Sequence, residues 1–266
     1  MSVPRTNRGV HRRDADAAPQ QEPRLRYQLI ACEIMLREAA LRAATSPHVL
    51  DLHFLTKGLH DNPEALRQQV QARIDELDPL PHDAVLLGYA LCSNGSVGLQ
   101  ARSAPLVIPR AHDCITFFLG SNEIYGRRHR DKPGTYYYTA GWIERDAAHA
   151  ERRPADGAGL DQAFEELVAK YGEDNARFLL EFQNQWQSNY TTAAYIRTEL
   201  GHRPDVEAEA RRAAETHGWE FEIIEGSDRL IRALIDGDWS EEEFLVVPPG
   251  CRVAAAYDGG IVRCEP

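Results

Sequence analysis

Residues 83–120 read DAVLLGYALCSNGSVGLQARSAPLVIPRAHDCITFFLG, and the interpretation of the whole chain starts from this run. Two short apolar segments in it, Ala84–Leu87 and Leu106–Ile108, predict buried strands because they are brief, aliphatic and bounded by Gly or Pro. A polar loop with a thiol follows each segment, with Cys92 after the first and Cys114 after the second.

A third copy of this arrangement lies upstream, where the predicted strand Tyr27–Ala31 leads directly into Cys32. Three of the five cysteines therefore follow the carboxyl end of a predicted strand. In a parallel α/β sheet that edge is where ligands bind, and neighbouring strands lie about 5 Å apart. We expect the three thiols to lie close together at one ligand-binding edge.

The segments around these strands predict an α/β protein. Helices are predicted over residues 33–44 and 63–77, with a strand over 48–55 between them and a brief helix after Cys92. Asp61 or Asn62 is expected to cap the second helix, since Pro63 follows at its first position. Strands over 219–224 and 244–247, with a helix over 227–235, form a second β/α unit.

This order favours a doubly wound, mostly parallel sheet in two β/α halves around a cleft, with a helical middle section. The predicted parts are a disordered tail (1–24), an N-terminal half that carries the Cys/His site (25–145), and the helical section with the C-terminal half (146–266).

Composition limits the classes of function. The net charge of −11 argues against nucleic-acid binding, which needs a positive surface. No apolar run approaches the roughly 20 residues that cross a bilayer, so no membrane association is expected. The N-terminal residues lack the apolar core of a signal peptide, and five cysteines is an odd number in a chain too large to need disulfides. We expect a cytoplasmic protein with free or metal-bound thiols.

The cysteines are the main candidates for chemistry. Cys32, Cys92 and Cys114 are predicted to bind one metal ion, with His112 or His60 as a fourth ligand. Thiolate with imidazole suits zinc or, as an alternative, a [4Fe–4S] cluster. The local zinc signature C-x-x-C is absent, and buried free cysteines are commonly structural. A catalytic pair of Cys92 or Cys114 with His112 is a further alternative.

Other residues near these loops are candidates for binding and catalysis. Arg110 could hold a carboxylate or phosphate, and the backbone at Asn94 and Gly95 could face an anion. Glu33 is a candidate general base or a partner that orients a metal ligand, and as an alternative a first-turn carboxylate favoured by the helix dipole.

Each of these candidates has a structural alternative. Asp113 could simply cap the helix that follows it, which would leave His112 exposed, and Arg110 could be a surface residue. One predicted helix face carries four aromatic residues, Phe178, Phe182, Trp186 and Tyr190. Such a face usually packs in a core. As an alternative, this helix could form a lid over the cleft, with Tyr190 as a substrate-binding candidate. No role is assigned to Cys251 and Cys264.

With these residues in view, the chain resembles an uncharacterised family, number 1638 among the domains of unknown function. The resemblance rests on the segments ACE (31–33), LHDNP (59–63), GYALCSNG (88–95), IPRAHDC (108–114), LGSNEIY (119–125), WQSNY (186–190) and FLVVPPG (244–250). Such proteins are often encoded beside corrinoid proteins and corrinoid-dependent methyltransferases, so the resemblance implies a corrinoid protein as a further partner. His112-Asp113-Cys114 is also similar to the H-x-C element of zinc methyltransferases, although the other cysteines here precede it and those enzymes are barrels.

The function expected from the sequence is a metal-dependent enzyme that acts on a small molecule. Glu33, Arg110 and His112 are its catalytic candidates, and transfer of a methyl or other small group to or from a thiol is the favoured reaction. The alternatives are a [4Fe–4S] lyase or dehydratase, and a non-catalytic chaperone for a metal or corrinoid.

Overall fold

The computed structural model describes residues 23–78, 80–150, 189–200, 203–257 and 259–266, together with residues 168, 172 and 173. Nearly all of the predicted tail lies outside the described residues. So does most of the predicted helical middle section, including Phe178, Phe182 and Trp186.

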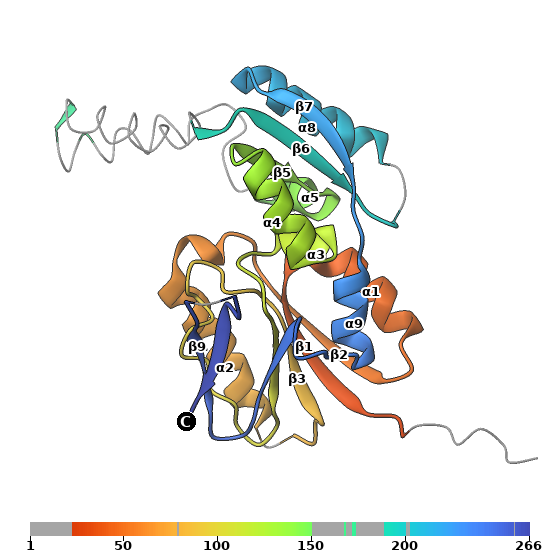
Figure 1. Ribbon diagram of the computed structural model, residues 1–266, viewed down its shortest axis with the longest axis vertical. Helices are drawn as coiled ribbons and strands as arrows, with labels where there is room; N and C mark the ends of the chain where they lie inside the picture. The colour runs from red at the N-terminus through yellow and green to blue at the C-terminus, as the bar shows by residue number, and fades with distance from the viewer. Residues whose placement is uncertain are drawn as a thin grey trace, which may run out of the picture.

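Five strands form the larger sheet (Figure 1). In spatial order they are β2 (Val49–Leu55), β1 (Arg26–Cys32), β3 (Ala84–Gly88), β4 (Leu106–Pro109) and β8 (Phe244–Val247). The first four run parallel, and β8 lies antiparallel to β4. Every residue of β3 and β4 is buried, as expected for short aliphatic strands covered on both faces. The predicted mostly parallel α/β sheet is confirmed.

Helices cover both faces of this sheet. After the short turn η1 (Glu33–Met35), α1 (Leu36–Thr45) connects β1 to β2, and after η2 (Leu59–Asp61), α2 (Pro63–Leu77) returns the chain to β3. These two connections run in opposite directions across the sheet, so right-handed crossovers place α1 and α2 on opposite faces. Figure 1 shows this arrangement, with α9 (Arg229–Asp236) beside α1. The predicted cap of α2 is confirmed, since the Asn62 side chain accepts a hydrogen bond from the Ala65 amide.

The connection from β3 to β4 contains no helix, so the brief helix predicted after Cys92 is wrong. Residues 92–98 form consecutive turns. Cys92, Ser93 and Asn94 have φ values of 47°, 55° and 68°, which no right-handed helix can contain.

A smaller sheet of three parallel strands lies beside the first (Figure 1). Its order is β5 (Thr135–Tyr138), β6 (Thr192–Arg197) and β7 (Glu220–Glu225), with α5 (Ala140–Ala150) and α8 (Pro204–His217) packed against it. The helices α3 (Ile115–Leu119) and α4 (Asn122–Asp131) lead from the first sheet to the second. The chain then returns through α9 and β8 to the larger sheet and ends in a hairpin, β9 (Arg252–Ala255) and β10 (Val262–Glu265).

The carboxyl edges of the two sheets face each other. η1, which follows β1, packs on α5, which follows β5, and a Cβ on Gly141 would lie only 1.9 Å from the carbonyl oxygen of Ile34. Glycine is therefore needed where the two backbones meet. Lys57, which follows β2, donates from its Nζ to the carbonyl of Trp142 at 3.3 Å. None of the helices in the described part of the chain is long and apolar enough to cross a membrane.

Candidate cysteine site

The three predicted cysteines lie at the carboxyl edge of the larger sheet. Cys32 is the last residue of β1, and Cys92 and Cys114 lie in the loops that follow β3 and β4. These three strands are neighbours in the sheet. Cys32 and Cys92 are each 8% exposed, Cys114 is partly buried, and all three thiols are free.

Backbone hydrogen bonds join the loops that carry Cys92 and Cys114. The Leu91 amide donates to the Ala111 carbonyl at 2.9 Å, and the Cys92 amide donates to the His112 carbonyl at 3.0 Å. The two loops therefore continue the pairing of β3 with β4 beyond the ends of the strands, and they form one unit.

The Cys92 loop is held in a strained conformation. Three successive non-glycine residues have positive φ, a region in which an L-residue costs roughly 1–2 kcal/mol. The Ser96 hydroxyl fixes the loop by donating to the Ala90 carbonyl at 2.6 Å. A Cβ on Gly95 would lie 2.5 Å from Cδ2 of Leu66, so the loop packs tightly on α2. Strain of this kind, maintained by the surrounding structure, is characteristic of functional sites.

Burial and mutual repulsion keep the thiols protonated. Burial raises the pKa of Cys32 to about 11 and that of Cys92 to about 12. Burial also raises the pKa of Cys114, and the charges of Asp113, Cys92 and Cys32 raise it further. The thiols are thus close enough to affect one another's ionisation. A bound cation would reverse this effect and favour the thiolates.

Tyr89 lies at this site, although the sequence analysis did not select it. It follows β3 directly, is 3% exposed, and its hydroxyl has no hydrogen-bond partner among the described residues. Cys32 and Tyr89 directly follow the paired residues Ala31 and Gly88 of β1 and β3, so they lie at the same level of the sheet edge. Burial raises the pKa of Tyr89, and so do the charges of Cys32, Cys92 and Cys114. The signal available in the sequence was its position at the end of a buried strand.

Asp113 and Tyr125 stabilise the Cys114 loop. The Asp113 carboxylate accepts from the Ile115 amide at 3.0 Å and from the Tyr125 hydroxyl at 2.6 Å. Burial raises the pKa of Asp113, whereas the Tyr125 hydrogen bond lowers it. Asp113 therefore caps α3, as the structural alternative proposed, and the side chain of His112 is exposed.

Glu33 and His60 lie near this edge but have other partners. One oxygen of Glu33 accepts from the Lys57 amide at 2.9 Å, and the other lies 3.7 Å from Nη1 of Arg145. His60 lies 3.3 Å from Asp61, and its ring centroid is 6.1 Å from that of Trp142.

The structure does not bring all of the predicted binding residues to the cysteines. Arg110 donates from Nη1 to the carbonyls of Gly260 and Val262 at 2.9 and 2.6 Å, and from Nε to the carbonyl of Glu241 at 2.8 Å. Tyr190 packs against Tyr136 and Trp219 in the smaller sheet.

The backbone amide of Gly95, which was predicted to face an anion, is hydrogen-bonded within its own loop instead. The Gly95 amide donates to the Cys92 carbonyl at 2.9 Å and so stays within the loop. The Asn94 side chain is exposed.

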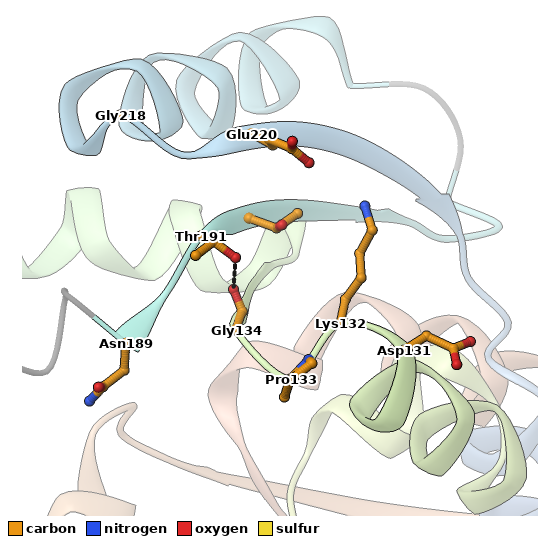
Figure 2. A pocket seen from close by; sticks show the side chains of 9 residues that line it. Asp131, Lys132, Pro133, Gly134, Asn189, Thr191, Gly218 and Glu220 are labelled. Atoms are coloured by element: carbon orange, nitrogen blue, oxygen red, sulfur yellow. Dashed lines mark hydrogen bonds between the residues drawn. The ribbon is translucent and has the colours of Figure 1, made fainter.

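Two open pockets lie away from the cysteine site. One pocket, of about 650 Å³, lies at the amino edge of the smaller sheet and is lined by Lys132, Asn189 and Glu220 among others. Figure 2 shows these residues, with the Thr191 hydroxyl donating to the Gly134 carbonyl at 3.4 Å. The other, about 580 Å³, lies beside Arg110 and Cys264. Neither is lined by Cys32, Cys92 or Cys114.

A single-ion site is not formed by the residues that the structure describes. Among them, no group of three or more His, Cys, Asp or Glu side chains is placed so that it could hold a metal ion.

Residues 54–235, well over half of the chain, match a family described as "Protein of unknown function (DUF1638)". The chain belongs to the DUF1638 family. The DUF1638 match contains Tyr89, Cys92 and Cys114, whereas Cys32 lies before it. No curated protein and no solved structure matches this chain.

Proposed function

We propose that this DUF1638 protein is an iron–sulfur enzyme in which Cys32, Cys92 and Cys114 hold a [4Fe–4S] cluster. The observation that carries the proposal is the convergence of three thiols, two of them buried and one partly buried, from three neighbouring strands on one edge of the sheet. The proposed reaction is the addition or removal of water, or a related lyase step, on a small substrate.

The donor set suits this group. Iron–sulfur clusters are held by cysteine thiolates, and soft sulfur ligands select iron–sulfur or zinc over magnesium and calcium. Thiolates at these positions would repel one another, so all three can be ionised together only with a positive centre between them. The charge of Lys57 lowers the pKa of Cys32, but burial raises it by more.

A cluster accommodates thiols that lie farther apart than the ligands of one zinc ion. Zn–S bonds are about 2.3 Å long, so the sulfurs around one zinc lie within roughly 4 Å of one another. A cluster lies between its ligands and spaces the sulfurs farther apart. The thiols here interact electrostatically, but the described residues hold no group arranged for a single ion.

Cys32, Cys92 and Cys114 would hold the cluster, and the cluster would supply Lewis-acid chemistry to a substrate oxygen. The protein supplies the environment. The strained turn at Cys92 and the Asp113–Tyr125 hydrogen bond position two of the ligands, and the low exposure of Cys32, Cys92 and Tyr89 excludes water.

Anaerobic purification followed by iron, acid-labile sulfide and zinc analysis tests the proposal. A brown protein with about four iron atoms and four sulfides per chain is the expected result. A colourless protein with one zinc would favour instead the zinc-dependent methyl transfer, with a corrinoid protein as partner. Protein that binds neither metal under reconstitution would overturn both forms of the proposal.

A further inference from the structure

The buried hydroxyl of Tyr89 has no hydrogen-bond partner among the described residues. A buried polar group without a hydrogen bond costs about 1–3 kcal/mol, so native structures rarely contain one. The other tyrosine near Cys114 differs in this respect: the Tyr125 hydroxyl donates to Asp113 at 2.6 Å. Tyr89 follows Gly88 at the end of β3, just as Cys32 follows Ala31, the residue that pairs with Gly88, and its hydroxyl has no such partner among the described residues.

The neighbouring carboxylate does not serve as that partner. Glu33 accepts from the Lys57 amide through one oxygen and faces Arg145 through the other. Its charge is therefore directed toward the smaller sheet. A ligand of the cysteine site would supply the partner that the Tyr89 hydroxyl lacks.

A positive charge lies at the same edge. The Lys57 ammonium group donates to the Trp142 carbonyl and lies 3.7 Å from the centroid of the Trp142 ring, so two contacts hold its position. The Lys57 amide donates to Oε1 of Glu33 at 2.9 Å, and Glu33 directly follows Cys32, so Lys57 lies at the same edge as that thiol. The Tyr89 hydroxyl and the Lys57 ammonium group, at the edge where the cluster is proposed, together suit a ligand with an anionic oxygen.

We propose that Tyr89 binds the ligand of the cysteine site by donating a hydrogen bond to its oxygen, and that the ligand is a small carboxylate. This inference rests on the proposed iron–sulfur function. Tyr89 is then a substrate-binding residue, and Lys57 provides the charge that selects an anion over a neutral molecule.

The test uses the full chain with its reconstituted cluster and lactate as the probe. Lactate binding is followed by the electron paramagnetic resonance spectrum of the reduced cluster, which changes when the cluster gains a ligand. Tyr89→Phe should keep the iron and sulfide content of the wild type and raise the apparent dissociation constant for lactate about 10- to 100-fold. Lys57→Met should also weaken binding. Tyr27→Phe is the matched control, because Tyr27 is equally buried but lies at the amino end of β1.

Each outcome decides a separate point. Equal lactate affinity in Tyr89→Phe and the wild type would overturn the role of Tyr89, as would failure of Tyr89→Phe to assemble the cluster while Tyr27→Phe assembles it. A wild-type cluster that does not respond to lactate would overturn the carboxylate class. A wild-type protein without iron and sulfide would overturn the proposed function, and this inference with it.

Discussion

The amide of Cys92 donates a hydrogen bond to the carbonyl of His112, at 3.0 Å, and this bond joins the loops after β3 and β4. Cys92 and Cys114 are thereby placed on one rigid unit, although 21 residues separate them in the sequence and only short strands precede them. Cys32 approaches the unit from β1, the neighbouring strand. The site therefore consists of a paired element and one further ligand on the adjacent strand.

Cys32→Ser, Cys92→Ser and Cys114→Ser should each abolish assembly of the cluster, because a hydroxyl is a poor ligand for soft metals. Cys251→Ser and Cys264→Ser are matched controls, since both residues are free thiols on the C-terminal hairpin, and they should keep the iron and sulfide content of the wild type. Iron and sulfide analysis after anaerobic reconstitution measures the effect. Full iron content in all three of the first variants would place the ligands elsewhere.

Gly88→Ala should destabilise the protein by about 1–3 kcal/mol, as overpacking of a core does. Gly88 pairs with Ala31 across β3 and β1, and a Cβ on Gly88 would lie 2.3 Å from that of Ala31. The strands would have to separate immediately before Cys32 and Tyr89. Gly259→Ala is the control, because nothing lies within 4 Å of its Cβ position. Urea unfolding of the two variants gives the comparison, and equal stability would contradict the close approach.

The sequence predicted the larger sheet well because short aliphatic runs bounded by Gly and Pro are specific for buried parallel strands. It also placed Cys32, Cys92 and Cys114 on the correct edge, since that follows from strand direction alone. It could not predict that β8 returns to pair antiparallel with β4, because pairing between distant segments leaves no local pattern.

Individual side chains were harder to predict than strands. Arg110 lies close to Cys114 in the sequence, yet its guanidinium group donates to the carbonyls of Gly260 and Val262 in the C-terminal hairpin and of Glu241 before β8. These contacts depend on how residues 241–262 fold back onto the sheet. Tyr89 was missed for the opposite reason: a tyrosine in an apolar run reads as core, and only the structure reveals that its hydroxyl lacks a partner.

Arg110→Ala should reduce stability by about 1–3 kcal/mol, since three carbonyls lose their donor. The variant should keep its iron and its affinity for lactate. Arg110→Lys should not restore stability, because an ammonium group cannot reproduce the forked geometry of the guanidinium. Thermal unfolding and the lactate titration separate the two roles: a stable variant with weak lactate binding would support the substrate-binding role expected from the sequence.

Glu38 should make the stability of the protein depend on pH. Burial raises its pKa, the charges of Asp228 and Glu144 raise it further, and its Oε2 has no hydrogen-bond partner among the described residues. The folded state thus holds the proton more tightly than the unfolded state does. The resulting stability is complete below the unfolded pKa of about 4.3 and is lost as the pH rises through the folded value.

Glu38→Gln removes this titration while keeping an oxygen that can accept from the Thr198 hydroxyl, as Glu38 does at 3.0 Å. Relative to this variant, the wild type should lose free energy of unfolding as the pH increases from 4 toward neutrality. Urea unfolding across that range measures the difference, and a constant difference would refute the expectation.

The pair of Arg42 and Asp228 should contribute far more to stability than an exposed ion pair. Arg42 extends from α1, and its Nε and Nη2 donate to the two oxygens of Asp228, each at 2.6 Å, while the Asp228 side chain is 2% exposed. Arg42 also binds Glu199, which follows β6, so it connects α1 and α9 to the smaller sheet. Arg42→Met should cost about 3–5 kcal/mol because it leaves a buried carboxylate without its counter-ion.

The double variant Arg42→Met with Asp228→Asn should recover part of that loss, since no buried charge remains. Arg26→Met is the control: Arg26 pairs with Asp51 at 2.8 Å, but the two side chains are 51% and 39% exposed, and the expected loss is about 0–1 kcal/mol. Urea unfolding of the four proteins at neutral pH decides the matter. Similar losses of unfolding free energy in Arg42→Met and Arg26→Met would contradict this expectation. They would mean that water reaches Asp228 once its partner is removed, so that the junction between α1 and α9 is less well packed than its burial indicates.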